Sequence, residues 1–174
     1  MATRLELLEL GDDALYFDEP CPPAVAAQID SAAHHYGQPI AEQRLLYAYF
    51  LAPEQLSVLV AIYRYYFYQH RLEDALVVAE RAIEVSARRL QLVGSWRNLG
   101  PVTLGQAAMR SMGMLRFHLL ALKGSAVILL RLGHSREARA RLEKIAEVDA
   151  RDAFGVQPLL QVIDRRHAPD PEPA

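Results

Sequence analysis

The side chains best suited to chemistry are six histidines and one cysteine in a chain of 174 residues. The histidines are His34, His35, His70, His118, His134 and His167. No pair combines a metal-ligand spacing on one helix face with a matching carboxylate, so we expect no metal site and interpret the histidines as surface or turn residues. The sequence also lacks a glycine-rich phosphate loop, an HExxH motif and a GxSxG motif. We therefore predict that the protein is not an enzyme and binds no cofactor.

The single cysteine, Cys21, excludes an internal disulfide and a cysteine-based zinc site. It precedes two prolines, and no basic residue lies close to it in the sequence. Reactive thiolates need such a neighbour or a helix N-terminus. Because Pro22 and Pro23 suit a helix start, a thiol-based sensor built on Cys21 stays open as an alternative function.

Composition restricts the class of partner. The net charge is -2, so the chain lacks the basic field with which nucleic-acid binders displace counterions. An apolar fraction of 52% fits one globular domain with a sizeable core. MATRLELLELGDD does not resemble a secretory signal, and LLALKGSAVILLRLG is interrupted by Lys123 and Arg131 and is too short to span a bilayer. We expect a cytoplasmic protein that binds neither nucleic acid nor membrane.

Aromatic residues gather in one part of the chain. All eight tyrosines lie between Tyr16 and Tyr68, and IYRYYFYQH places four of them around Phe67. One face is only about a third of a helix circumference, so these rings cannot all be core residues. Trp96 lies separately, in a loop between Gly94 and Gly100. Aromatic residues and arginine dominate the energetics of interfaces, so both regions are candidate binding surfaces.

Three segments, 22–55, 56–89 and 119–152, share a helical pattern. In the second, Leu59, Ile62, Tyr63 and Tyr66 follow the spacing of an amphipathic helix and form the predicted packing stripe. Small residues recur in the second helix of each segment, where two helices would cross. They are Ala41, Ala75 and Ala138, followed by Ala48, Ala82 and, less well, Ile145. Neither helix of a pair can bury its stripe alone, so the pairs must stack.

These segments resemble tetratricopeptide repeats, since Ala41 and Ala75 are 34 residues apart, which is the repeat length of that family. The resemblance implies an all-α fold of three helical hairpins in a short right-handed solenoid. The family's closing proline is present only as Pro53. Its turn glycine is present only as Gly133, with Tyr36 and His70 at that place in the earlier repeats.

The remaining chain is predicted to flank or interrupt a single domain over 22–166. Residues 1–21 form an acidic N-terminal arm, 90–118 an insert, 156–166 a capping helix and 167–174 a disordered tail. Within the insert, Thr103 is a plausible N-cap. The helix that it begins is expected to run unbroken into the third repeat and to end near Leu132.

The resemblance also implies a concave groove lined by set positions of each first helix. These are Ala26, Asp30, Ala33 and His34; Val60, Arg64, Phe67 and Tyr68; and Lys123, Val127, Leu130 and Arg131. Together with the loop tryptophan, they give Arg64, Phe67, Tyr68, Trp96, Lys123 and Arg131 as candidate protein-binding residues. Two alternatives remain: the arm or the insert fills the groove, and Trp96 pins the insert onto the repeats.

Over YFDEPCPP, YRYYFYQHRLEDALVVAERAIE and LRFHLLALKGSAVILLRLG, the chain is similar to small tetratricopeptide proteins that accompany nitrogenase in nitrogen-fixing bacteria. This resemblance implies a non-catalytic accessory factor that stabilises a larger protein, namely the nitrogenase molybdenum–iron protein. One alternative is a chaperone like those of type III secretion, which would bind an extended client peptide. Another is a self-associating scaffold, because stacked repeats with incomplete caps can form homo-oligomers through their ends.

Overall fold

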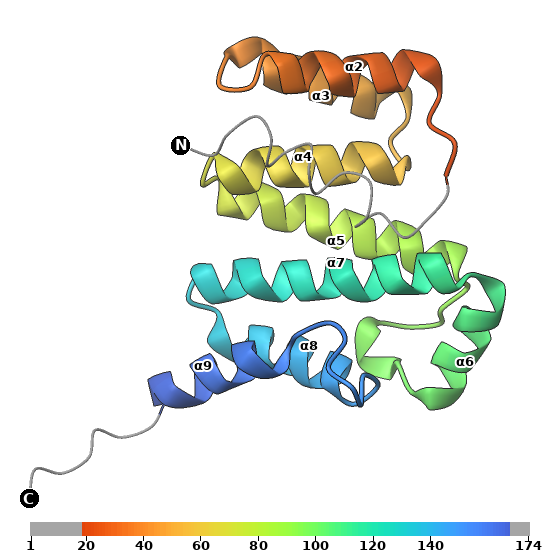
Figure 1. The fold of residues 1–174 in the computed structure, drawn as a ribbon, viewed down its shortest axis with the longest axis vertical. Coiled ribbons are helices and arrows are strands. Elements are labelled where there is room, and N and C mark those ends of the chain that lie inside the picture. The colour runs from red at the N-terminus through yellow and green to blue at the C-terminus, as the bar shows by residue number, and fades with distance from the viewer. Residues whose placement is uncertain (1–18, 168–174) are drawn as a thin grey trace, which may run out of the picture.

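The computed structural model describes residues 19–167, and all regular structure in that range is helical (Figure 1). The eight α-helices of this range are α2 (Pro23–His34), α3 (Pro39–Leu51), α4 (Leu56–Tyr68), α5 (Leu72–Arg89), α6 (Pro101–Arg110), α7 (Met112–Arg131), α8 (Ser135–Ala146) and α9 (Gln157–His167). A 3-10 helix, η1 (Trp96–Asn98), lies in the loop after α5. Most of the predicted acidic arm (1–18) and tail (168–174) lies outside the described residues.

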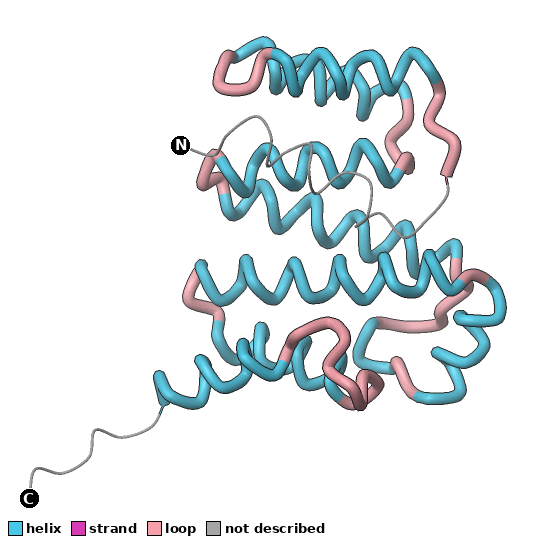
Figure 2. The backbone as a smooth tube through the Cα atoms, in the orientation of Figure 1, coloured by secondary structure: helices cyan, strands magenta, loops and turns pink. Residues whose placement is uncertain are grey.

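Consecutive helices pack as hairpins, and the hairpins stack on one another. Helix α2 packs on α3, α4 on α5 and α7 on α8, while α3–α4 and α5–α7 contacts join the pairs. Figure 1 shows these pairs as successive layers, and Figure 2 shows the short loops that connect most of them. Helix α9 packs on α8 at the C-terminal end. The prediction of an all-α protein built from sequential helical hairpins is confirmed.

Alanines allow the helices to approach closely at the crossings. Ala41, Ala48, Ala75 and Ala138 are completely buried, and so is Ile145. A larger side chain at one of the alanines would push the paired helices apart, because protein cores contain little free volume. The small-residue pattern read from the sequence therefore coincides with the contacts between helices.

The turns between paired helices use left-handed backbone conformations. Gly133 has φ +86° after α7, and His70 has φ 58° after α4. In the first hairpin, Gly37 with φ 87° fills this role. The prediction that Tyr36 stands there is off by one residue, because glycine adopts this conformation without the steric cost of a Cβ atom.

The prediction of one long helix from Thr103 to about Leu132 is wrong. Ser111 has an extended backbone, with φ -163° and ψ 107°, and it separates α6 from α7. Its hydroxyl accepts a hydrogen bond from the Met114 amide at 3.1 Å and so caps the start of α7. Helix α6 begins at Pro101 with Gly100 as its N-cap, so Thr103 lies inside the first turn. The predicted end near Leu132 agrees with the structure, where Leu132 is the C-cap of α7.

Helix α7 is longer and more apolar than its central segment suggested. The helix has 20 residues, and an 18-residue window of it has a mean hydropathy of 1.5, which by length and composition suffices to cross a bilayer. The helix contacts α5, α6 and α8, and half of its apolar stretch is buried among them. Burial at the centre of the helical stack therefore accounts for its composition.

Candidate functional site

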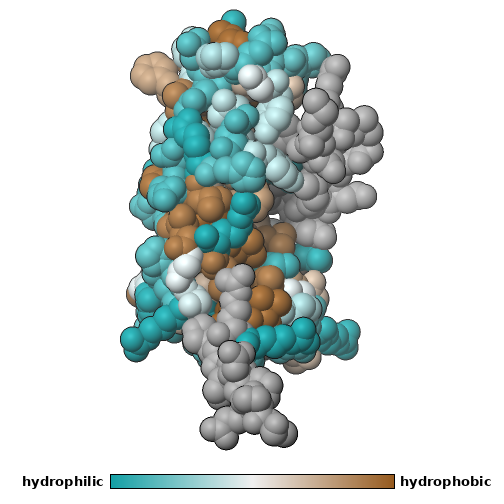
Figure 3. Space-filling view, turned by 90° about the vertical axis from the view of Figure 1, so that its left-hand side faces the viewer, coloured by the Kyte–Doolittle hydropathy of each residue, from teal (hydrophilic) through white to brown (hydrophobic). Residues whose placement is uncertain are grey.

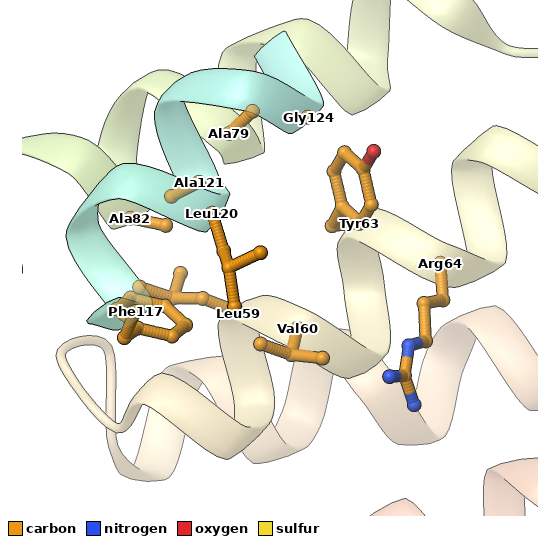
Figure 4. A pocket seen from close by; sticks show the side chains of 10 residues that line it. All are labelled: Leu59, Val60, Tyr63, Arg64, Ala79, Ala82, Phe117, Leu120, Ala121 and Gly124. Atoms are coloured by element: carbon orange, nitrogen blue, oxygen red, sulfur yellow. The ribbon is translucent and has the colours of Figure 1, made fainter. Parts of the chain in front are cut away.

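A groove with a cavity of about 170 Å³ is formed by α4, α5 and α7 (Figure 4). The residues that line it are Leu59, Val60, Tyr63, Arg64, Ala79, Ala82, Phe117, Leu120, Ala121 and Gly124. Most of these side chains are apolar. Figure 4 shows the Arg64 guanidinium and the Tyr63 hydroxyl as the polar groups at its margin. An apolar cleft with few polar groups suits a leucine-rich or aromatic segment of a partner.

Gly124 makes room for Tyr63 in this groove. A Cβ atom at position 124 would lie 3.1 Å from the Tyr63 hydroxyl and 3.5 Å from the adjoining ring carbon. Burial raises the pKa of Tyr63 to about 12, so the phenol is neutral at physiological pH. The lack of a side chain at Gly124 on α7 therefore leaves room for the neutral Tyr63 ring of α4, and this close approach shapes the groove.

The aromatic run of α4 continues from the groove into a cluster with arginines. The Phe67 ring stacks on Tyr63 with centroids 5.9 Å apart and meets Tyr68 edge-to-face at 5.7 Å. The Arg131 guanidinium lies 4.8 Å from the Phe67 ring centroid. We call Arg64, Phe67, Tyr68 and Arg131 the aromatic-basic cluster. These four of the six predicted binding residues come together on neighbouring parts of α4 and α7.

Burial affects the charge of this cluster. It lowers the pKa of the Arg64 guanidinium, while the nearby Tyr68 and Tyr63 phenols act in the opposite direction. A partly desolvated cation favours an approaching carboxylate more than a fully hydrated one does. Figure 3 faces the side of the stack on which the turns after α4 and α7 lie, and hydrophobic surface occupies the middle of this side between more hydrophilic regions.

The other two predicted residues lie elsewhere. The Lys123 ammonium donates a 2.6 Å hydrogen bond to the Phe154 carbonyl and so ties the loop before α9 to α7. Trp96 is half-buried in η1 and packs against the core. Its ring lies between the Arg97 and Arg141 guanidinium groups, at 4.2 and 5.4 Å from the centroid. These contacts match the alternative in which Trp96 pins the insert onto the repeats.

Arg141 anchors this second region from inside the protein. Its side chain is only 5% exposed, yet it pairs with Glu80 and, at 2.8 Å, with Glu137, whose side chains are 43% and 45% exposed. It also donates a 2.6 Å hydrogen bond to the Ser125 hydroxyl. Nearby, the Lys144 ammonium binds Glu147 at 2.6 Å. We call Trp96, Arg141, Glu80, Glu137 and the adjacent His118 the Trp96 region.

His118 is not a surface or turn residue, which corrects the interpretation from the sequence. It is 1% exposed in α7, and its Nδ1 lies 2.9 Å from the Ser86 hydroxyl oxygen. That hydroxyl also lies 2.7 Å from the Ala82 carbonyl, and when it donates its one proton there it accepts from the Nδ1–H of the neutral imidazole. The other nitrogen, Nε2, is buried with no hydrogen-bond partner. Burial lowers the pKa of His118 to about 4, against a hydrogen bond to the Ile83 carbonyl that raises it.

Sequence reasoning missed the α7 side of the groove. Phe117, Leu120, Ala121 and Gly124 line it, whereas the predicted residues of this helix begin at Lys123. The reason is that α7 starts at Met112, inside the predicted insert, so its early turns add a wall to the groove. On α4, Tyr65 and Tyr66 are the buried tyrosines, at 9% and 8% exposure. Tyr63, which was expected on the packing stripe, is partly buried against the core and also lines the groove.

Cys21 lies beside the start of α4. Its sulfur accepts a 3.6 Å hydrogen bond from the Ser57 hydroxyl, and the side chain packs against the core under α2.

Within residues 19–167, no group of three or more histidine, cysteine or acidic side chains is arranged to hold a metal ion. Helix α3 exposes the large apolar side chains Leu46, Tyr47, Phe50 and Leu51.

Comparison with known proteins gives one informative relative. An uncharacterized 19.8 kDa protein in the nifW 5′ region of Azotobacter chroococcum mcd 1 is 43% identical over 164 residues, which cover 94% of this chain and 92% of that protein. No family model matches the chain, and no solved structure matches it. The likeness to tetratricopeptide repeats therefore rests on the alanine spacing and the stacked hairpins alone.

Proposed function

Because the chain belongs to the family of the uncharacterized 19.8 kDa protein in the nifW 5′ region of Azotobacter chroococcum mcd 1, we propose that it is a non-catalytic accessory factor of nitrogen fixation. Its hairpins form a short tetratricopeptide-like solenoid that binds and stabilises a larger protein in the cytoplasm. The client is the nitrogenase molybdenum–iron protein, bound in an incomplete form.

The observation that carries this proposal is the groove with its adjoining aromatic-basic cluster. An apolar cleft bordered by tyrosine, phenylalanine and arginine has the composition of an interface hot spot. The groove is built on three helices, α4, α5 and α7, rather than on loops, so its shape is largely fixed before binding and little conformational entropy is lost there.

The family relationship supports the choice of client. The relative's name places its gene beside nifW, within a nitrogen-fixation region. A gene in such a region supports a client that takes part in nitrogen fixation. The gene position therefore supports the choice of client, whereas the contact residues are inferred from the groove and the aromatic-basic cluster.

The test is direct binding to purified molybdenum–iron protein under anaerobic conditions, with the complete and the cofactor-deficient forms measured in parallel. We expect the incomplete form to bind, and the substitutions Arg64→Glu and Phe67→Ala to weaken binding by roughly tenfold or more each. Met109→Ala is the matched control, because Met109 is 83% exposed on α6, a helix that does not line the groove. If neither form binds, the client is wrong; if the control weakens binding as much as Phe67→Ala, the groove is wrong.

A further inference from the structure

The described chain begins at one end of the groove. The Glu19 carboxylate accepts a 3.1 Å hydrogen bond from the Leu56 amide at the start of α4 and pairs with Arg89 at 2.5 Å. The Pro20 carbonyl accepts a 3.4 Å hydrogen bond from the Gln55 side chain. Leu59 and Val60, which line the groove, follow Leu56 by about one helical turn, or about 5 Å along the axis.

The eighteen residues that precede Glu19 have a composition that complements the groove. They carry leucines at positions 5, 7, 8, 10 and 15, together with Tyr16 and Phe17. They also carry five acidic residues, Glu6, Glu9, Asp12, Asp13 and Asp18, against one basic side chain, Arg4. This segment is therefore both leucine-rich and strongly acidic.

The groove offers the opposite charge beside apolar walls. Leu59, Val60, Phe117 and Leu120 form apolar lining, and Arg64 stands at the margin. On α7, Arg116 precedes Leu120 by one turn and so lies on the same helix face. Partial burial of the Arg64 guanidinium makes a nearby carboxylate favourable.

Chain length permits the contact. From Glu19 back to Leu10, an extended chain spans up to about 30 Å. This exceeds the length of the groove side of α4, whose 13 residues measure about 20 Å. The leucines at positions 5 to 10 can therefore reach the lining residues in either an extended or a helical conformation.

We propose that residues 1–18 occupy the groove of their own chain in the free protein, with leucines on the apolar walls and carboxylates toward Arg64 and Arg116. A client that uses the groove must displace them, so the arm sets the threshold for binding. This regulatory consequence rests on the proposed function, whereas the occupancy itself does not.

The test is hydrogen–deuterium exchange of the full-length protein, read by mass spectrometry and compared with a synthetic peptide of residues 1–18. In the native chain, we expect amides of the arm to exchange roughly tenfold or more slowly than in the free peptide. The full-length double variant Leu5→Ser, Leu8→Ser and the groove variant Arg64→Glu should each lose this protection. Met109→Ser, on α6, should keep it.

Three results would overturn the proposal. The arm exchanges as fast as the free peptide; its protection survives both Arg64→Glu and Leu120→Asp, so that it binds elsewhere; or its protection falls on dilution, so that it binds the groove of a second copy. Protection without binding of the molybdenum–iron protein would instead remove the proposed client and keep the occupied groove. Client binding with an unprotected arm would remove only this inference.

Discussion

The aromatic-basic cluster and the Trp96 region use the same pair of residue types for different ends. In the first, the Arg131 guanidinium lies 4.8 Å from the Phe67 ring; in the second, the Arg141 guanidinium lies 5.4 Å from the Trp96 ring. Arg131 is exposed, and beside the aromatic ring it meets the His70 imidazole at 3.1 Å. Arg141 is buried and held by two carboxylates and a hydroxyl.

The difference shows that an arginine over an aromatic ring does not by itself identify a binding surface. What separates the two regions is how the charge is compensated inside the protein. Arg141 has its carboxylates supplied by α5 and α8, so it connects three elements and has little left to offer a partner. In the aromatic-basic cluster, Arg131 lies over the Phe67 ring and forms no ion pair with any carboxylate of residues 19–167, which leaves the Arg131 charge available to an acidic ligand.

The largest expected effect belongs to His118 in the Trp96 region. Its pKa is about 4 in the folded protein and 6.5 as the ordinary value, so the unfolded chain takes up the proton first as the pH falls. The free energy of unfolding should be highest above pH 6.5 and should fall by about 3 kcal/mol between pH 6.5 and pH 4 through this group. Urea denaturation across this range measures the loss. The variant His118→Leu should remove that part of the pH dependence, whereas His134→Gln, at an exposed histidine, should leave it.

A smaller effect compares the two arginines directly. Arg141→Met keeps the apolar stem but removes the pairs with Glu80 and Glu137, and it should lower the free energy of unfolding by about 2 kcal/mol. The partners are half-exposed and can be hydrated, which keeps the loss below that of a fully buried pair. Arg131→Met should cost less than about 1 kcal/mol, because its contacts are exposed. Equal losses in urea denaturation would break the distinction between the two regions.

The groove should respond to filling as well as to a change of charge at Arg64. In Gly124→Val, the new side chain meets the Tyr63 ring, and we expect a loss of about 1 kcal/mol of stability together with weaker client binding. Gly105→Val is the matched control, because a Cβ at position 105 on α6 has no neighbour within 4 Å. Thermal unfolding and the binding assay measure both. Similar behaviour of the two variants would mean that Gly124 does not shape the groove.

The smallest effect concerns the turn beneath the aromatic-basic cluster. His70 has φ 58°, a conformation that costs about 1 kcal/mol for a residue with a Cβ atom. His70→Gly removes this strain, but glycine also gains freedom in the unfolded chain, which offsets part of the gain. The net stabilisation should be about 0.5 kcal/mol. Gln91→Gly, at φ 55° after α5, serves as the reference. A loss of stability in His70→Gly alone would show that the contact with Arg131 outweighs the backbone strain.

The helical hairpins could be predicted because their signal is local. Ala41, Ala75 and Ala138 mark crossings through their spacing, and the structure buries all three completely. The break at Ser111 could not be predicted from periodicity, because the apolar pattern continues through it on both sides. The extended backbone of Ser111 separates the two helices, together with the hydrogen bond that its hydroxyl accepts from the Met114 amide.

The candidate site was only partly predictable, for a related reason. Arg64, Phe67 and Tyr68 lie on the helix that carries the aromatic run, and position along that helix suffices to group them. The opposite wall depends on where α7 begins, which sets whether Phe117 or Lys123 faces the groove. The burial of His118 and Arg141 depends on partners supplied by α5, and a linear sequence does not reveal that pairing.

The hydrogen bonds of the two lysines have a practical consequence for identifying any partner. Seventeen of the nineteen basic side chains are arginines, and the two lysines are Lys123 and Lys144. Their ammonium groups are held by Phe154 and Glu147. Amine-reactive cross-linkers therefore have few accessible attachment points on this protein, and interface mapping should use carboxylate-directed or photoactivated reagents instead.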